Sequence, residues 1–222
     1  MEDNSSARQR IILAAIDILN MEGASGITTR RIAEEASVNS AAVNYYFGSR
    51  DILIDQVLNI TLEHAFSDWR MILEVEEFDL PIRIYCLLYY TMEGISMYPG
   101  IVHSHLFDSS VKEVRRRVFA ERIDSLLDML STRLEERTPQ TGEELRLSLG
   151  QMLLTAISAA MIPELLLVIT KDDIAAAQAR SRFILHLMKR LLGIELVITD
   201  TIQNDINRLL AMAFTSEHQN SH

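Results

Sequence analysis

The side chains with the most recognisable chemistry lie together in a short segment, SAAVNYYF, at residues 40–47. They are small, amidic or phenolic, which is unusual for a helix that only fills a core. Asn44 can bond the edge of a base, and Tyr45 and Tyr46 can bond phosphate oxygens. Small residues such as Ala41 permit close approach within a major groove. We therefore expect this segment to contact duplex DNA.

Two short helices joined by a tight turn are predicted to position this segment. Thr28 can cap the first helix, TRRIAEEA, by accepting a hydrogen bond from an early backbone N–H. Ile32 and Ala36 lie on one apolar side of that helix because they are spaced by four residues. Residues 37–39 are too few for anything but a turn, and Asn39 can cap the second helix. The pattern therefore predicts a helix-turn-helix.

Polar side chains around the turn are assigned to the same interface. Arg30 can reach guanine O6 and N7 with its planar guanidinium, whereas Ser40 and Arg50 are expected to hold phosphates and set the register. The complete set of predicted DNA-binding residues is Thr28, Thr29, Arg30, Asn39, Ser40, Ala41, Ala42, Asn44, Tyr45, Tyr46 and Arg50. Two alternatives stay open, which are a surface helical hairpin that binds no DNA and a Tyr45 that packs in the core.

The segment GITTRRIAEEASVNSAAVNYYFGSRDIL, residues 26–53, resembles the DNA-binding segment of TetR-family transcriptional regulators. The resemblance extends over about residues 8–66. The chain departs from the usual family residues with Ser37 in place of Gly, Val43-Asn44 in place of Leu-Tyr, Tyr46 in place of His and Arg50 in place of Lys. A turn residue that needs a positive φ is less comfortable as Ser than as Gly. The resemblance implies a homodimer that binds a palindromic operator.

Composition limits the classes of protein that fit this sequence. The chain has 222 residues, 48% of them hydrophobic, and a net charge of −10. Such an apolar share favours a folded core over disorder. The acidity argues against non-specific nucleic-acid binding, although residues 7–50 carry five arginines against four acids. DNA affinity would therefore depend on a few well-placed contacts and on a dimer.

Three further features predict a cytoplasmic protein that makes no membrane contact. Cys86 is the single cysteine, so no disulfide within the chain is possible, which fits a reducing compartment. The first ten residues are polar and unlike a signal peptide. The most apolar stretch, residues 152–170, contains Pro163 and Glu164 and is expected to be a buried helix.

Apolar spacing predicts an all-α fold without a lasting strand pattern. A three-helix DNA-binding domain is expected over residues 7–54, and a connecting helix, 51–74, joins it to a larger helical domain for ligand binding and dimerisation at residues 75–215. The helices expected in the larger domain span residues 79–97, 101–107, 111–137, 143–170, 172–192 and 201–214, and residues 108–110 are expected to cap the third of them. The helix at 143–170 should bend near Pro163, and residues 138–142 form a linker.

A dimer interface is predicted on the two apolar helices at 143–170 and 172–192. Runs of small residues let helix axes approach closely, and two such helices from each subunit would form a four-helix interface, as in TetR-like proteins. The predicted interface residues are Met152, Ala156, Ala160, Ala176, Phe183, Leu187 and Leu191. An ordinary core within one chain is the alternative.

A ligand pocket is predicted among aromatic, methionine and histidine side chains between about Leu62 and Ile169. Mostly apolar linings with a few polar groups suit a small hydrophobic molecule, and Met adapts to varied shapes. The predicted lining is Trp69, Tyr85, Tyr89, Tyr90, Met92, His103, Phe107, Leu126, Met152 and Met161. Plain core is the alternative for each residue. His103 and His105 do not share a helix face, so no metal is expected.

The sequence therefore predicts a homodimeric transcriptional regulator, most readily a repressor that a small-molecule effector releases from its operator. It contains no Gly-rich phosphate loop, nucleophile elbow or His-Glu metal helix, so neither an enzyme nor a cofactor is expected. The alternative is a helical small-molecule binding or interaction protein without DNA contact. The salt dependence of DNA binding distinguishes these two functions, because the affinity of a protein for DNA falls steeply as the salt concentration rises.

Overall fold

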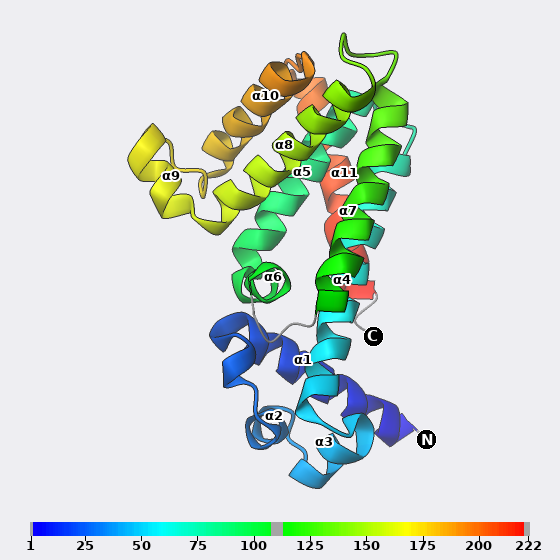
Figure 1. The fold of residues 1–222 in the computed structure, drawn as a ribbon, viewed down its shortest axis with the longest axis vertical. Coiled ribbons are helices and arrows are strands. Elements are labelled where there is room, and N and C mark those ends of the chain that lie inside the picture. Colours follow the sequence, from blue (N-terminus) through cyan, green and yellow to red (C-terminus); the bar gives the residue numbers. More distant parts are fainter. Residues whose placement is uncertain (1, 108–112, 220–222) are drawn as a thin grey trace. The chain divides into compact units, whose positions relative to one another are not determined.

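The chain folds into helices joined by turns, as the ribbon in Figure 1 shows. The computed structural model describes residues 2–107 and 113–219, and no strand occurs among them. This confirms the predicted all-α fold. Within the same residues no single helix is long and apolar enough to cross a membrane, and the apolar pair α8 (Gly142–Met161) and α9 (Pro163–Thr170) is bent by 100°.

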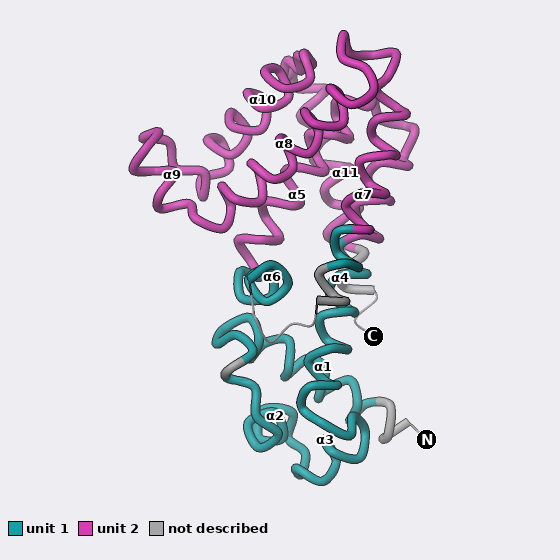
Figure 2. Tube along the Cα trace, in the orientation of Figure 1, with its two compact units in different colours: residues 1–65, 98–120 teal, residues 66–97, 121–222 magenta. Residues whose placement is uncertain are grey.

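Two compact units divide the helices (Figure 2). The first unit holds residues 1–65 and 98–120, and the second holds 66–97 and 121–222. Two helices, α4 (Arg50–Glu74) and α7 (Glu113–Leu134), contribute residues to both units. The sequence placed all of 75–215 in the second domain, whereas α6 (Pro99–Leu106) packs with the first.

Four segments at the N-terminal end build the first unit around one apolar core. They are α1 (Glu2–Glu22), the 3₁₀ turn η1 (Ala24–Gly26), α2 (Thr29–Glu35) and α3 (Ser40–Phe47). Each helix turns one face inward, so that Ile11, Ile32 and Phe47 are buried together with Leu53 of α4. Burying a side chain of this size stabilises the fold by about 1.5–3 kcal/mol relative to leaving it exposed.

Local capping sets the ends of the two short helices, as the sequence predicts. The Thr28 hydroxyl accepts a hydrogen bond from the Arg31 backbone N–H at 3.2 Å. The Asn39 side chain accepts one from the Ala42 N–H at 2.7 Å. Each cap satisfies a helix donor that lacks a partner within its helix. Gly48 ends α3 with a φ of 73°.

The N-terminus of α6 lies directly against the C-terminal end of α1. The Gly100 backbone N–H donates to the side-chain oxygen of Asn20 at 3.1 Å. A Cβ at Gly100 would stand 2.7 Å from the Leu19 carbonyl oxygen, and it would also collide with the Asn20 carbonyl. Only glycine therefore permits this approach, which attaches α6 to the first unit.

The second unit is built around α5 (Leu80–Met97), against which α8 (Gly142–Met161), α10 (Ala177–Leu192) and α11 (Asp200–Gln219) pack. Eleven of its 18 residues are buried. A helix that is apolar on nearly every side is stable only when other helices surround it. Its polar groups are satisfied internally; the Tyr90 hydroxyl, for example, donates to buried Asp68 at 2.5 Å.

Two expected helices of this unit differ in the structure. The predicted helix at 143–170 is two helices, α8 and α9 (Pro163–Thr170), because Ile162 leaves helical geometry before Pro163. Proline removes a backbone donor and clashes with the preceding turn. The predicted helix at 172–192 begins only at Ala177, since the Asp173 carboxylate accepts from the Ala175 N–H and favours a turn.

The C-terminal end of α4 is held by two arginines of the second unit. Arg83 from α5 and Arg133 from α7 both donate to the Leu73 carbonyl, at 2.6 and 2.7 Å. Positive groups are favourable at a helix C-terminus. Burial, followed by the neighbouring charge of Arg133, lowers the pKa of Arg83.

We predict that Gly100→Ala destabilises the protein by about 1–3 kcal/mol, because the added methyl overpacks the contact between α6 and α1. Gly94→Ala in α5 is the matched control, since a Cβ there meets no atom within 4 Å. Urea unfolding should show a loss for the first variant and no loss for the second. Equal stability of the two variants would contradict the close approach at Gly100.

Candidate nucleic-acid interface

Helix α3 presents a polar face because its apolar face is anchored in the first unit. Val43 and Phe47 are buried, and the Arg8 guanidinium lies over the Phe47 ring at 5.4 Å. Positions four apart fall on one side of a helix. Ser40 and Asn44 are therefore exposed together, and Ala41 and Tyr45 follow them on the same surface.

The tyrosine pair of α3 is divided between solvent and core. Tyr45 is 77% exposed, so the alternative that it packs in the core is wrong. Tyr46 is partly buried against the first-unit core. The two rings meet edge to face with centroids 5.2 Å apart. Tyr46 thus supports the ring of Tyr45, most of which is exposed to solvent.

The predicted contacts on α2 are also at the surface. The Arg30 side chain is 87% exposed and pairs with Glu34 one turn later, at 2.9 Å. The hydrogen bond to Glu34 raises the pKa of Arg30, so the guanidinium stays charged. Exposed pairs of this kind contribute little to stability, and Arg30 can exchange Glu34 for another acceptor at small cost.

Arg50 has a different environment from the one the sequence suggests. It was predicted to bind phosphate, but its guanidinium donates to the Ile27 carbonyl at 2.5 Å and to the Ala24 carbonyl. A third contact joins it to Asp51 at 3.2 Å. These bonds attach the start of α4 to the turn that precedes α2. The sequence gives no sign of this, since the two carbonyls are 23 and 26 residues away.

Arg10 is a second arginine whose structural role the sequence did not reveal. It donates to the Ala36 carbonyl at the end of α2, at 3.1 Å. The carbonyls at the end of a helix lack internal partners, so this bond completes the α2 terminus. Arg10 lies 26 residues before its partner, and no local motif identifies such a pair.

The turn between α2 and α3 requires an unusual backbone conformation. Ser37 has a φ of 53°, in the left-handed region, where a residue other than glycine costs about 1–2 kcal/mol. Serine in place of the usual glycine at this position therefore strains the backbone of the turn. The Val38 N–H donates to the Ala33 carbonyl at 2.9 Å across the turn.

Charge around the interface is nearly balanced. Arg31 pairs with Glu22 at 2.6 Å, and Arg30 and Arg50 also have acidic partners. The structure therefore presents few uncompensated cations beside α3, in line with the small positive balance of residues 7–50.

The predicted ligand residues do not form one site. Tyr85 and Tyr89 line a pocket of about 400 Å³ in the second unit. Others are ordinary buried side chains, namely Trp69, Tyr90, Met92, Leu126 and Met152. Met161 is half-buried at the end of α8. His103 and Phe107 are exposed on the first unit.

The predicted dimer residues are largely turned inward. Met152, Ala156, Ala160 and Leu187 are buried within their own chain, because the faces that carry them pack among α5, α8 and α10. Phe183 and Leu191 are half-buried, and Ala176 is exposed. The buried members cannot offer surface to a partner, so any interface on these helices must use other residues.

We predict that Arg50→Gln lowers the free energy of unfolding by about 1–3 kcal/mol, because buried carbonyl acceptors lose their donor. Arg30→Gln is the matched control and should change stability by less than about 0.5 kcal/mol. Denaturant unfolding of both variants provides the measurement. If Arg50→Gln were as stable as Arg30→Gln, the internal role of Arg50 would be wrong.

Comparison with known proteins adds independent information. Residues 11–57 match the family model described as bacterial regulatory proteins, tetR family. The tetracycline repressor protein class C of Escherichia coli is 33% identical over 79 residues, which cover 32% of this chain and 36% of that protein. The matched region therefore spans about a third of the repressor's length.

Two further similarities extend beyond the helix-turn-helix. The nucleoid occlusion factor SlmA of Vibrio vulnificus is 28% identical over 145 residues, 63% of this chain and 72% of that protein. A transcriptional regulator from Rhodococcus sp. Rha1 shares the fold with a TM-score of 0.61 at 18% identity, covering 85% of this chain and 98% of that one. The N-terminal segment that contains α2 and α3 is thus similar to the bacterial regulatory proteins of the tetR family, and the chain shares the fold of a solved transcriptional regulator.

Proposed function

We propose that this protein is a homodimeric DNA-binding transcriptional regulator, most readily a repressor that releases its operator when a small molecule binds. The exposed polar face of α3 carries the proposal. Asn44 and Tyr45 project from it, while Val43 and Phe47 hold the opposite face in the core. A major groove admits one helix, and its base edges are read by side chains of this kind.

The proposed contacts divide into two kinds. Asn44 and, on α2, Arg30 bond base edges, whereas Ser40 and Tyr45 bond phosphates and position the helix. Thr28, Thr29, Asn39, Ala41, Ala42 and Tyr46 complete the proposed surface. Arg50 is left out of the proposed contacts, because its guanidinium already bonds carbonyls of the first unit.

A second copy of the chain is needed because helix-turn-helix proteins bind half-sites about one helical turn apart, ~34–36 Å. Exposed apolar residues on α8 and α9 support a self-interface. Leu154 on α8 is 63% exposed, Val168 and Ile169 on α9 are 65% and 68% exposed, and α9 has no buried residue. Exposed apolar surface on neighbouring helices marks candidate interaction sites.

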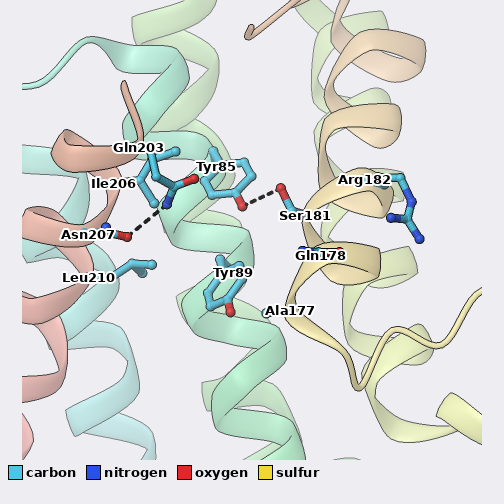
Figure 3. Close-up of a pocket in the computed structure, with 10 residues that line it drawn as sticks. All are labelled: Tyr85, Tyr89, Ala177, Gln178, Ser181, Arg182, Gln203, Ile206, Asn207 and Leu210. Carbon is cyan, nitrogen blue, oxygen red and sulfur yellow. Dashed lines mark hydrogen bonds between the residues drawn. The ribbon is translucent and has the colours of Figure 1, made fainter. Parts of the chain in front are cut away.

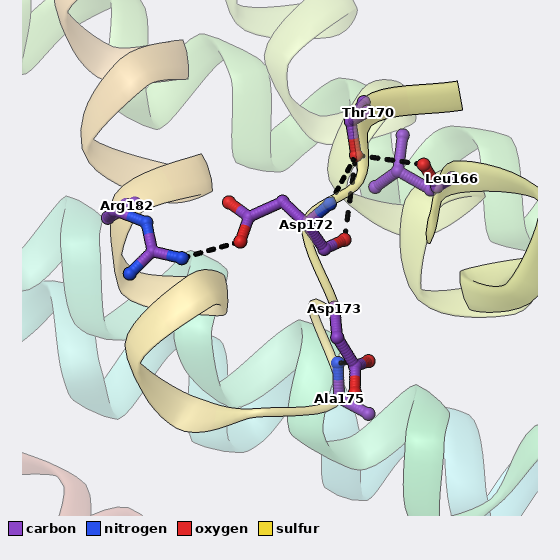
Figure 4. Close-up of polar contacts among 6 residues, drawn as sticks. All are labelled: Leu166, Thr170, Asp172, Asp173, Ala175 and Arg182. Carbon is purple, nitrogen blue, oxygen red and sulfur yellow. Dashed lines mark hydrogen bonds and ion pairs between the residues drawn. The ribbon is translucent and has the colours of Figure 1, made fainter. Parts of the chain in front are cut away.

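Local bonds hold α9 in this exposed position (Figure 4). The Thr170 hydroxyl donates to the Leu166 carbonyl at 2.8 Å and accepts from the Asp172 N–H at 3.2 Å. Arg182 of α10 then pairs with the Asp172 carboxylate at 2.5 Å. The link between α9 and α10 is therefore ordered, and we propose that it presents α9 to the partner subunit.

Helix α4 is the proposed connection between effector and DNA. Arg50 ties its first turn to the first unit, and Arg83 and Arg133 tie its last turn to the second unit. A helix held at both ends transmits a displacement of one end to the other. An effector that prefers one dimer shape would shift the population and change the separation of the two α3 helices.

A second candidate function follows from the longer alignment with nucleoid occlusion factors. In that case the protein takes part in nucleoid occlusion, and its DNA sites need not lie beside genes that it regulates. Sequencing the DNA fragments retained by the purified protein separates the two. Sites upstream of genes favour a repressor, and sites with no neighbouring promoter favour the second candidate.

We predict that Asn44→Ala weakens binding to the selected DNA site by about 1–3 kcal/mol, because one base contact is lost. Binding to unrelated DNA should change little. Asn59→Ala is the matched control, since Asn59 is also exposed but lies on α4. Fluorescence anisotropy at fixed salt measures both affinities. Unchanged affinity of Asn44→Ala would count against α3 as the recognition helix.

We predict that Val168→Asp shifts the protein from dimer to monomer, because a desolvated carboxylate is costly in an apolar interface. Val197→Asp is the control, since Val197 is 67% exposed but lies outside α8 and α9. Sedimentation velocity reports the mass of each variant. A dimeric Val168→Asp protein, or a monomeric Val197→Asp protein, would show that the partner docks elsewhere.

A further inference from the structure

A pocket of about 400 Å³ opens on the second unit between α10 and α11, with α5 behind it (Figure 3). Both flanking helices pack on α5. Ligand pockets in proteins range over about 300–1,000 Å³, so this one suits a small molecule. It shares only Tyr85 and Tyr89 with the ligand residues that the sequence predicted.

Two tyrosine rings of α5 line the pocket. The rings of Tyr85 and Tyr89 stack with centroids 6.1 Å apart and an angle of 25° between their planes. The Tyr85 hydroxyl donates to the Ser181 hydroxyl at 2.9 Å, and burial raises the pKa of Tyr85. The phenol is therefore neutral near pH 7 and fixed in position.

A buried arginine holds the second ring. The Arg180 guanidinium lies over Tyr89 at 5.1 Å and pairs with Glu93 of α5. It also donates to the Ile174 carbonyl at 3.2 Å. Because all of these contacts lie within the chain, Arg180 is a support for the ring, and its charge is compensated before any ligand arrives.

The rim supplies hydrogen bonds without a free charge. Gln203 donates to Asn207 at 2.9 Å across one turn of α11, and Gln178 projects from α10. Carboxamides offer both donors and acceptors. Arg182, the charged side chain of the lining, is paired with Asp172 at 2.5 Å. Ile206 and Leu210 complete the wall with apolar surface.

We propose that this pocket binds an uncharged aromatic compound that carries an amide or phenol group on its ring. The ring packs against Tyr89, Ile206 and Leu210, and the polar group bonds the carboxamides of the rim. The charged side chain of the lining, Arg182, is already engaged by Asp172, so an anion would have to displace that carboxylate. A purely apolar ligand would leave the remaining hydrogen-bonding capacity of these carboxamides unused.

Such a ligand would be the effector of the proposed regulator, and that regulatory role rests on the proposed function. Ligand binding itself does not depend on DNA. Arg182 joins the pocket to Asp172 in the link between α9 and α10, so a ligand that displaces Arg182 would disturb the proposed dimer contact.

Methyl NMR of the full-length protein tests the site with 4-hydroxybenzamide as the probe. The methyl signals of Ile206 and Leu210 should shift saturably, whereas Ile18 in the first unit should not shift. Two related probes define the class. 4-Hydroxybenzoate adds a charge and cyclohexanecarboxamide lacks the aromatic ring, and both should bind at least about tenfold more weakly.

Variants distinguish this pocket from non-specific binding. Tyr89→Ala should weaken the probe at least about tenfold by removing the stacking ring, and Tyr89→Phe should retain most of the affinity. Gln178→Trp, an exposed substitution that fills the pocket without touching the core, should block binding. Tyr45→Ala on α3 is the matched control and should bind the probe like the wild type.

No saturable shift at Ile206 and Leu210 at millimolar probe would overturn the proposal. So would equal affinity in Gln178→Trp and the wild type, or tighter binding of 4-hydroxybenzoate. These results are independent of the DNA measurements on Asn44→Ala. A protein that binds the probe but no DNA would support the proposed pocket and contradict the proposed regulator. A protein that binds DNA but not the probe would support the regulator and contradict the pocket.

Discussion

The burial of Val43 and Phe47 is the constraint on which the surface of the first unit depends. With these two side chains in the core, α3 has only one orientation, and Ser40, Ala41, Asn44 and Tyr45 face solvent. Asn39 and Gly48 then set where the helix begins and ends. The small and polar residues of SAAVNYYF are exposed because the core leaves them no other place. This explains why a segment so poor in charge still forms a defined surface.

Several arginines in this chain act as ties between backbone segments. Arg10 bonds the end of α2, Arg50 bonds the turn before it, and Arg83 and Arg133 share one carbonyl at the end of α4. Guanidinium groups suit this role because they present several donors in a fixed plane. The number of arginines therefore overstates the positive charge available to DNA. The proposed DNA contacts depend on Arg30 and a few polar side chains.

The second unit combines a deeply buried helix with unusually exposed ones. α5 is surrounded and supplies both the core and the tyrosine pair of the pocket. α9, by contrast, is apolar but has no buried residue. An isolated chain gains nothing from such a helix in water, since its apolar surface stays hydrated. Burying the apolar surface of α9 against another protein surface would remove this cost. A second copy of the chain is the proposed partner.

Much of the first unit followed from local rules in the sequence. Thr28 and Asn39 were predictable as caps because a capping bond involves residues only three apart, and the strain at Ser37 was predictable from the tight turn between two helices. The helical period also indicated an all-α fold, and it located α4 and α5 to within a residue or two.

Other features were decided only by tertiary packing. The partners of Arg50 lie more than twenty residues away, and α6 joins the first unit through one close approach at Gly100. The sequence could not identify which face of α8 points inward, because both faces carry apolar or small residues. Packing against α5 buries Met152 and Ala156, whereas Leu147 and Leu154 stay exposed. Local sequence determines caps, periods and breaks, since these depend on neighbours along the chain. Which apolar face is covered depends on the shapes of distant helices, and that information exists only once they have packed.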